Sequence, residues 1–404
     1  MRLAPGRMVK DSCPFPFAVN HLNDLSDGYG DMRANNPVPR VVLPSGDPAY
    51  LITRYADAQA VLADRRFSAN ISRPEAARLR EGPDGNLSNP FSDDRAWHIR
   101  WRRLMALGLN PRVVERAHGP IQEIAHELAA EMAAMTPPVD LLEAYATRLP
   151  VEAICVFLGI PPLDRAKIRR CVDALGTSSA ADFEERAEAG REMWEYGASL
   201  IAYKRDEPGD DLVTSLIAAH DEEDGKLSEE ELVLSFMALI VGNNISTAQQ
   251  IGQGVFTLLC NPDQLAALRA DRDLLPGAIE ELLRVTPIYT GLPRFATEDI
   301  EVGGVLIPRN ATVLVVRQSA HQDDTWIEAP EVCDIKRTNA NRHLAFGYGH
   351  SFCIGAAFAR LQLRCAFTAL MDRFPALELA VPESEVGWSY RLMGSGATAI
   401  PVTW

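Results

Sequence analysis

The chain has 404 residues, 47% of them hydrophobic, so it can bury a large core, and length alone allows two or three domains. Its formal net charge of −15 argues against nucleic acid or an anionic membrane as the main partner. Seven cysteines without CxxC or His-paired metal spacing favour a reducing compartment over a disulfide framework. Neither a signal peptide nor a run of about 18 apolar residues is evident, so we predict a cytoplasmic globular protein.

The N-terminal quarter predicts a hairpin, a short helix and a long loop. Apolar runs at 41–43 and 49–53 flank a Pro-Ser-Gly-Asp turn, which indicates a β-hairpin. Residues 56–62 have the pattern of a short amphipathic helix. Residues 67–94 are polar and rich in Ser, Asn, Pro and Gly, and a loop of this length is usually either functional or disordered.

A basic helix is predicted to open at Trp97. His98 and Arg102 lie four residues apart, on one face of it. From these residues alone, a solvated basic face is the simpler interpretation. Residues 112–220 then alternate amphipathic helices with breaks marked by Pro or Gly.

An unusually long helix is predicted next. Ser228 and Glu231 form a capping box, and the helical pattern continues to about Leu259, roughly 45–50 Å at 1.5 Å per residue. Its middle, at 242–247, reads Gly-Asn-Asn-Ile-Ser-Thr. Buried amides and hydroxyls need partners, so a polar network, a ligand or water must face them. A kink satisfied by neighbouring residues is the alternative interpretation.

The sequence after this helix carries an ion-pair motif and several strands. Glu281 and Arg284 form Glu-x-x-Arg, an i,i+3 pair on a helix that is common and weak by itself. Strand-rich sequence follows at 292–296, 300–305 and 311–316, and closing strands are predicted at 378–381 and 397–402.

The most informative stretch is Phe-Gly-Tyr-Gly-His-Ser-Phe-Cys-Ile-Gly at 346–355, directly before a helical run to about Phe374. Its three glycines let the backbone turn sharply and approach a flat ligand. The helix N-terminus and nearby N–H groups lower the pKa of the Cys353 thiol, so we predict a thiolate. A haem iron uses such a thiolate as a fifth ligand that favours O–O cleavage. A buried structural cysteine would be the simpler interpretation of a lone Cys, but it does not account for this spacing.

This stretch resembles the haem-binding signature of the cytochromes P450, and the other landmarks follow in that family's order from residue 41 onward. The resemblance implies a mainly α protein with a small β subdomain, the cytochrome P450 fold, in a single domain over residues 1–404. It implies haem b, with Cys353 as the metal ligand, and dioxygen as the oxidant. It also implies a small-molecule substrate and electrons from a separate ferredoxin and its reductase.

The resemblance also assigns roles to individual residues. It implies haem-propionate contacts from His98, Arg102, Arg294 and His343. It implies a cofactor-binding loop that contains Phe346, Gly347, Cys353 and Gly355. The Glu281–Arg284 pair would fix the loop beneath the haem, while residues 67–94 and 164–204 would cover the substrate. We further predict pocket positions at Gly242, Thr247, Thr290, Met393 and Gly394.

The long helix departs from the family pattern. Most P450 hydroxylases carry Ala-Gly-x-(Asp/Glu)-Thr there, and the acid and alcohol relay protons. Counting back from Glu-x-x-Arg aligns the Thr with Ser246 and the acid with Ile245, which cannot carry a proton. Aligning on the Gly instead places Asn244 at the acid and Ile245 at the Thr. The relay is incomplete in either register, and we predict Ser246, Asn244 and Asn243 as the catalytic residues.

Two further departures concern the haem loop. The position two residues before the Cys is usually His or Arg for a propionate, and here it is Ser351, with His350 one residue earlier. Val332 stands where an Arg normally completes a triad with the Glu/Arg pair, so we predict that this network is incomplete.

These departures, and the sequence near the chain end, look like the actinobacterial P450s that oxidise cyclodipeptides. We therefore predict oxidation of a diketopiperazine containing Trp or Tyr, in secondary-metabolite biosynthesis, by radical C–C or C–N coupling. Coupling members can carry an Arg in the terminal turn, and counting back from Trp404 places Gly394 there, beside Met393. The alternative is a monooxygenase that hydroxylates or epoxidises a macrolide, terpene or other natural product. A haem protein that only senses a ligand is the hypothesis from another class.

Overall fold

The computed structural model describes residues 13–15, 17, 28–79, 95–176, 183–221, 228–288, 291–389 and 396–404. Its contacts divide the chain into two compact units, and each unit combines segments that are far apart in the sequence. Unit 1 consists of Met1–Asp93, Phe256–Cys353 and Glu383–Thr398, and unit 2 of Asp94–Val255, Ile354–Pro382 and Ala399–Trp404. That the two units together form one functional domain stays a prediction.

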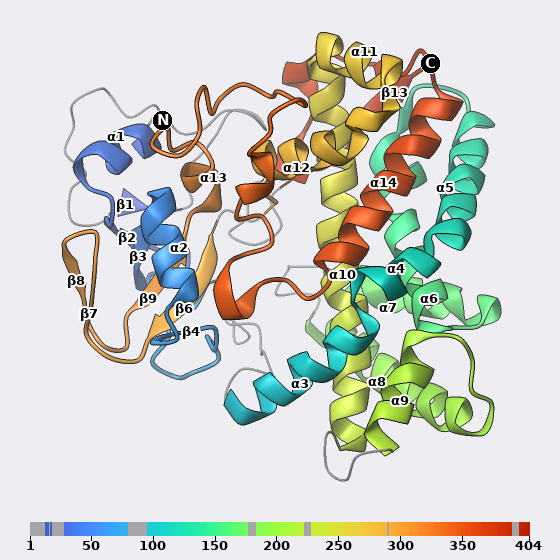
Figure 1. The fold of residues 1–404 in the computed structure, drawn as a ribbon, viewed down its shortest axis with the longest axis horizontal. Helices are drawn as coiled ribbons and strands as arrows, with labels where there is room; N and C mark the ends of the chain where they lie inside the picture. Colours follow the sequence, from blue (N-terminus) through green and yellow to red (C-terminus); the bar gives the residue numbers. More distant parts are fainter. Residues whose placement is uncertain are drawn as a thin grey trace. The chain divides into compact units, whose positions relative to one another are not determined.

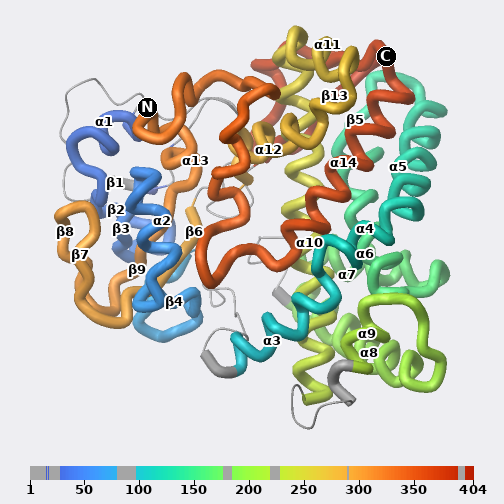
Figure 2. Tube along the Cα trace, viewed as in Figure 1, coloured from blue at the N-terminus to red at the C-terminus, as the bar shows by residue number. Residues whose placement is uncertain are grey.

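Unit 1 is built on a mixed sheet with the strand order β1-β2-β3-β9-β6-β4, in which N-terminal strands lie beside strands from residues 292–315 (Figure 2). Its strands are β1 (Cys13–Pro14), β2 (Arg40–Val42), β3 (Pro48–Ile52), β4 (Phe67–Ser68), β6 (Leu292–Ala296) and β9 (Thr312–Val315). The predicted hairpin is confirmed, because β2 and β3 are antiparallel with Val41 opposite Ala49. Next to it β3 runs parallel to β9, and β9 runs antiparallel to β6, with Arg294 opposite Val313.

Short helices and two hairpins complete unit 1. The helices are α1 (Gly28–Asn35), α2 (Tyr55–Ala63), α11 (Pro262–Ala270), α12 (Leu275–Val285) and α13 (Arg317–Ala320); the hairpin strands are β7 (Ile300–Val302), β8 (Val305–Ile307), β11 (Trp388–Ser389) and β12 (Gly396–Ala397). The strand-rich run predicted at 300–305 is thus a hairpin, turned by Gly303 and Gly304 in positive-φ conformations. Side chains of α2, β9 and β6 share a buried apolar core that includes Leu62, Val313 and Ala296.

Unit 2 is mainly helical (Figure 1). Its elements are α3 (Arg95–Gly108), α4 (Pro111–Arg116), α5 (His118–Ala133), α6 (Arg148–Leu158), α7 (Arg165–Gly176), α8 (Phe183–Asp206), α9 (Leu212–Asp221), most of α10 (Glu229–Cys260), α14 (Ala356–Arg373), and a small sheet of β5 (Val139–Asp140), β10 (Glu378–Leu379) and β13 (Pro401–Thr403). Helix α14 packs along α5 and is also held by the Tyr145 hydroxyl, which donates to the Ala366 carbonyl at 3.1 Å.

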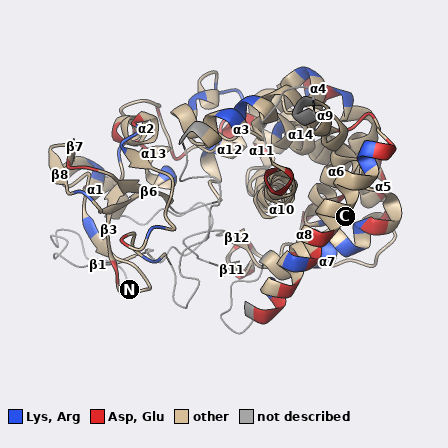
Figure 3. Ribbon diagram, turned by 90° about the horizontal axis from the view of Figure 1, so that it is seen from below, with Lys and Arg blue, Asp and Glu red and all other residues tan. Residues whose placement is uncertain are grey.

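The long helix α10 begins with the predicted capping box. The Ser228 N–H donates to Glu231 Oε2 at 2.5 Å and the Glu231 N–H donates to Ser228 Oγ at 3.2 Å. Acidic residues lie at this end of the helix, and its remainder is largely uncharged (Figure 3). Its length and hydropathy also suit a membrane span, but core helices of soluble proteins pass the same test. Here α8 packs so closely on α10 that a Cβ on Gly197 would lie 2.9 Å from Phe236.

Candidate active site

The loop that carries Cys353 is fixed by its backbone. The Cys353 N–H donates to the Phe346 carbonyl at 2.8 Å, which closes the loop around a 3₁₀ turn at Gly349–Ser351. Gly347 and Gly349 have φ values of +75° and +67°, which favour glycine. A Cβ on Gly349 would lie 2.8 Å from the Ala63 Cα, so this glycine allows close contact with α2. Gly355 lies in the turn that caps α14, but its φ of −85° does not require a glycine.

Cys353 differs from the other cysteines whose side chains the structure describes. It is exposed, whereas four of the other five are buried and Cys260 is partly buried. Burial raises the thiol pKa of these five, to about 12 in four of them: Cys155, Cys260, Cys333 and Cys365. Such thiols stay neutral at physiological pH and are poor metal ligands. Among the described cysteines, Cys353 alone therefore combines exposure with a position at the start of a helix.

A buried charge network lies in unit 1 beside this loop. Glu281 and Arg284 on α12 are fully buried and form two hydrogen bonds of 2.7 Å each. Arg337 Nε donates to Glu281 Oε1 at 3.1 Å, so the network has the third arm that the sequence analysis expected to be missing. That expectation was wrong because it considered Val332 alone: Arg337 lies five residues later and reaches Glu281, and the Val332 carbonyl accepts from Arg284 at 2.9 Å.

His321 connects this network to the Cys loop. Its Nδ1 lies 2.8 Å from the Arg284 carbonyl, and its Nε2 accepts from the Leu344 N–H at 2.8 Å. The carbonyl can only accept and the N–H can only donate, so the proton lies on Nδ1 and the ring is neutral. Burial is the main reason that the pKa of His321 lies well below its ordinary value. The residues just before Phe346 are thereby held by the same network as α12.

Arg294 is a buried cation on β6. Only 4% of its surface is exposed, its Nη1 donates to the Pro293 carbonyl at 2.8 Å, and its Nε is buried without a hydrogen-bond partner. No carboxylate among the described residues pairs with it. Burial, with a contribution from the nearby charge of Arg317, lowers its pKa to about 10. A buried charge of this kind needs an anion, which an anionic ligand group could supply.

His343 lies in the same unit but has protein partners. Its Nδ1 accepts from the Ala345 N–H at 3.1 Å, and its Nε2 lies 3.3 Å from Glu280 Oε2. Nδ1 is therefore used within the protein, whereas Nε2 lies near the carboxylate without hydrogen-bond geometry, so the predicted propionate contact would have to come from Nε2. The ring also lies 5.8 Å from that of Phe346, between centroids.

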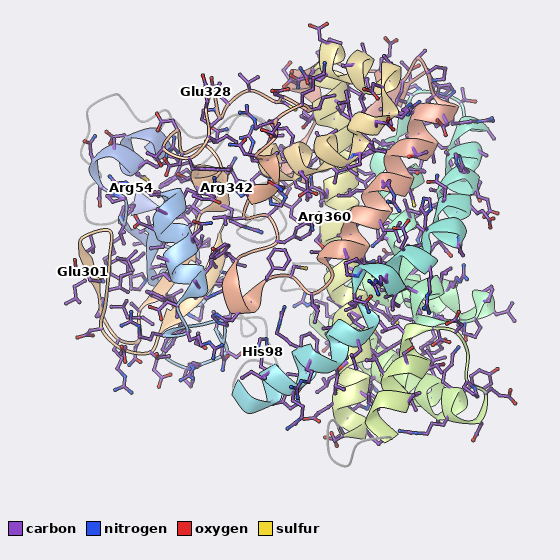
Figure 4. The ribbon with its side chains drawn as sticks, viewed as in Figure 1. Arg54, His98, Glu301, Glu328, Arg342 and Arg360 are labelled. Atoms are coloured by element: carbon purple, nitrogen blue, oxygen red, sulfur yellow. The ribbon has the colours of Figure 1, made fainter. Side chains whose placement is uncertain are left out.

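The predicted basic pair lies on α3 of unit 2. His98 projects from this helix (Figure 4), and both it and Arg102 are partly exposed. The helix is anchored by Trp101, whose Nε1 donates to Ser235 Oγ on α10 at 2.9 Å. The buried indole turns one face of α3 to α10, and the His98 ring lies beside it, with ring centroids 6.2 Å apart.

The polar residues in the middle of α10 have different partners. Asn243 bridges two helices, because its Nδ2 donates to the Pro150 carbonyl of α6 at 2.9 Å and its Oδ1 accepts from Gln362 of α14 at 2.7 Å. Asn244 is buried, its Nδ2 donates to the Ile240 carbonyl at 2.6 Å, and its Oδ1 has no hydrogen-bond partner. Ser246 Oγ donates to the Gly242 carbonyl at 2.9 Å. The two hydrogen bonds of Asn243 therefore join helices, whereas Asn244 Oδ1 and Ser246 Oγ can still accept hydrogen bonds.

One face of α10 remains open. Its partly exposed residues recur at helical spacing: Leu234, Met237, Ala238, Val241, Gly242, Ile245, Ser246 and Gln249. Val241 is 37% exposed, and no atom lies within 4 Å of the place a Cβ on Gly242 would occupy. Thr247 is buried and lies off this face. An apolar face with one hydroxyl is suited to a largely apolar ligand.

Comparison with known proteins identifies the family. The cytochrome P450 family model matches residues 184–389. The chain is 38% identical over 400 residues to nocardicin C N-oxygenase of Nocardia uniformis subsp. tsuyamanensis, covering 98% of this chain and 99% of that protein. It is 36% identical over 394 residues to mycinamicin IV hydroxylase/epoxidase of Micromonospora griseorubida, covering 96% and 98%. The chain belongs to the cytochrome P450 family.

The predicted fold class is confirmed by a solved P450 structure. A mutant of the mixed-function P450 MycG in complex with mycinamicin IV matches with a TM-score of 0.90 at 36% identity, covering 97% of this chain and all of the other. The protein is accordingly an oxidoreductase that uses dioxygen, and its cofactor is haem b. Haem held by a cysteine thiolate supplies oxygen activation, because the thiolate donates electron density that favours O–O cleavage.

The described residues fit this cofactor in two respects. Cys353 presents an exposed sulfur on a rigid loop, as an iron ligand must. Arg294 is a buried cation without a carboxylate partner, which is complementary to a haem propionate. Cys353 as ligand and the propionate contacts of His98, Arg102, Arg294 and His343 remain proposals, as do the loop roles of Phe346, Gly347 and Gly355. Thr290, Met393 and Gly394 lie outside the described residues.

Sequence reasoning missed four residues of these networks. Arg317, His321 and Arg337 belong to unit 1, and Gln362 belongs to α14 of unit 2. None lies in a motif whose spacing indicates a partner, and each bonds to a residue at least 28 positions away in the sequence. The one available sequence signal was an Arg close to position 332, where the third residue of the Glu281–Arg284 network was expected. That Arg is Arg337.

Proposed function

We propose that this P450 is a monooxygenase that inserts one oxygen atom into a macrolide or a comparably large natural product, by hydroxylation or epoxidation. The observation that carries this proposal is near full-length similarity, at 36%, to a mycinamicin IV hydroxylase/epoxidase. The relative with 38% identity is named an N-oxygenase, which is also an oxygen-inserting enzyme. The open apolar face of α10 supports the proposal, because large natural products bind mainly through apolar contacts.

In this proposal, Ser246 supports proton delivery. Its hydroxyl donates to the Gly242 carbonyl, and its two lone pairs can accept a hydrogen bond from water. Asn244 Oδ1, buried without a partner, would hold such a water nearby by accepting one of its hydrogens. Ile245 contributes only apolar surface at the position where most relatives of this type carry an acid.

Oxidative coupling of an aromatic cyclodipeptide is the second candidate. The observation that favours it is Ile245, because a weakened proton relay suits hydrogen or electron abstraction without oxygen insertion. The named relatives support oxygen insertion better. We further propose that a ferredoxin supplies the electrons and that the enzyme works in the cytoplasm.

The test begins with optical titration of the ferric protein. Macrolides, terpenes and aromatic cyclodipeptides are added separately, and saturable shifts of the Soret band are recorded. Compounds that bind are then turned over with a surrogate ferredoxin and reductase, and the products are analysed by mass spectrometry. We expect a product heavier by one oxygen atom. A product that lacks two hydrogens and gains no oxygen, formed from a cyclodipeptide, would replace this proposal by the coupling hypothesis.

Variants of α10 sharpen this test. Ser246→Ala should lower product formed per electron consumed by a factor of about 10 or more, because general acid–base assistance typically contributes 10²–10⁴-fold. Ser215→Ala is a matched control, since that exposed hydroxyl on α9 also donates to a helix carbonyl, at 3.0 Å. Equal yields from both variants would remove Ser246 from proton delivery.

A further inference from the structure

Unit 1 buries two arginines close together. Arg294 on β6 and Arg317 at the start of α13 are 4% and 3% exposed. Their charges interact, since Arg317 contributes to the lowered pKa of Arg294. Two like charges in a buried place destabilise each other unless an anion offsets them. For Arg294, no described carboxylate does so.

Arg317 also contacts the segment that leads into the Cys loop. Its Nη1 donates to the carbonyl of Ala345, the residue before Phe346. A guanidinium carries five N–H donors in a planar fork, a geometry that can bind a carbonyl and an anion at the same time. Arg317 is therefore placed beside the cofactor loop as well as beside Arg294.

The Cys loop itself lacks a cation at one position. P450 loops usually carry His or Arg two residues before the Cys, and this chain has Ser351. His350, one residue earlier in the loop, lies near Asp64, beyond the end of α2, and contributes to the lowered pKa of that carboxyl, after the larger effect of the hydrogen bonds from Arg66. A cation from another element can take the place that Ser351 leaves uncharged.

We propose that Arg317 supplies this charge and, together with Arg294, binds a haem propionate. Arg294 lies on β6, and Arg317 follows β9 at the start of α13. Strands β6 and β9 are neighbours in the sheet. The bond from Arg317 to Ala345 would then tie the propionate site to the loop that carries the iron ligand. Arg317 is thus a positioning residue for the cofactor, and this inference is independent of which substrate the enzyme oxidises.

The test compares three variants of the haem-loaded protein. Arg317→Gln removes the charge, Arg317→Lys keeps it, and Arg309→Gln removes a charge from an exposed residue of the same unit. The measurements are the rate of haem transfer to apomyoglobin and the ferric–ferrous midpoint potential as a function of pH. Neither depends on a substrate or on turnover.

We expect Arg317→Gln to lose haem roughly tenfold faster, since it removes a charge-assisted hydrogen bond to the propionate. Its potential should fall, because one cation fewer near the haem favours the more positive ferric state. The pH range over which the potential changes should move upward, because a propionate without its cation has a higher pKa. Arg317→Lys should keep a potential close to that of the parent, and Arg309→Gln should match the parent throughout.

A purely structural role would give different results. If Arg317 only holds the Ala345 carbonyl, Arg317→Gln and Arg317→Lys would weaken haem retention alike, with the potential and its pH range unchanged. That outcome, or haem loss equal to that of Arg309→Gln, would overturn the proposal. If Arg317→Gln fails to fold, haem loss from Arg317→Lys decides: loss at the parent's rate supports the proposal, and clearly faster loss with an unchanged potential overturns it.

Discussion

The Cys loop of unit 1 and the middle of α10 in unit 2 are held in different ways. The segment that leads into the loop is held by residues from elsewhere in unit 1: Arg317 donates to the Ala345 carbonyl, and His321, which also bonds to the Arg284 carbonyl, accepts from the Leu344 N–H. In the middle of α10, Asn244 and Ser246 bond to carbonyls four residues earlier on the same helix. The first region has little freedom to change without losing its support. In the second region, substitutions at Asn244 and Ser246 break no side-chain bond to another element. This is the region where the chain departs from the usual P450 pattern.

The largest expected effect concerns the loop itself. Cys353→Ser should abolish the thiolate-type optical spectrum of the carbon monoxide complex and reduce turnover to background, because an alcohol does not replace the thiolate ligand. Cys260→Ser is the control in the same unit, since the pKa of that thiol is raised to about 12 by burial and by Glu383. A spectrum that survives in Cys353→Ser would show that the iron ligand is another residue.

The next effect concerns the network that supports the loop. Glu281→Gln should lower the free energy of unfolding by about 3–5 kcal/mol, because it leaves the buried charge of Arg284 without its carboxylate. Denaturant unfolding measures this. Glu298→Gln, which removes an exposed partner of Arg66, should leave stability unchanged. Equal stability of both variants would mean that the Glu281 network does not hold unit 1 together.

The network should also show a pH dependence. Folding lowers the pKa of His321, so the unfolded chain takes up a proton below about pH 6.5 that the folded chain does not. The contribution of neutral His321 to the free energy of unfolding is therefore fully present above that pH. It decreases as the pH falls, by up to about 1.4 kcal/mol per pH unit. His321→Gln should flatten the fall in unfolding free energy between pH 7 and 5.5, whereas His118→Gln should not. An unchanged slope in His321→Gln would exclude this assignment.

The smallest effect is expected in α10. Asn243→Ala and Gln362→Ala remove the two ends of one hydrogen bond, and a double-mutant cycle should give a coupling energy of about 0.5–1.5 kcal/mol. Gln122→Ala, which loses a 3.4 Å contact to the Cys365 carbonyl, should be additive with Asn243→Ala. Additivity in the Asn243–Gln362 pair as well would show that this bond contributes nothing to the packing of α10 on α14.

Sequence patterns predicted the loop better than its surroundings. The spacing of Gly347, Gly349 and Cys353 reflects backbone requirements that are local, and the structure shows two of these glycines at positive φ. The capping box at Ser228 was likewise local and is confirmed. The third arm of the Glu281 network was missed because Arg337 reaches it across 56 residues, where no spacing rule applies.

The sequence by itself determined the family, the long helix and the position of the candidate iron ligand, because each depends on residues that are neighbours along the chain. Only the tertiary structure decided that Asn243 ties α10 to α6 and α14, that His343 has protein partners, and that Arg294 and Arg317 are both buried. These contacts join residues from separate elements. Their partners are set by how helices and strands pack, which the order of residues along one element does not encode.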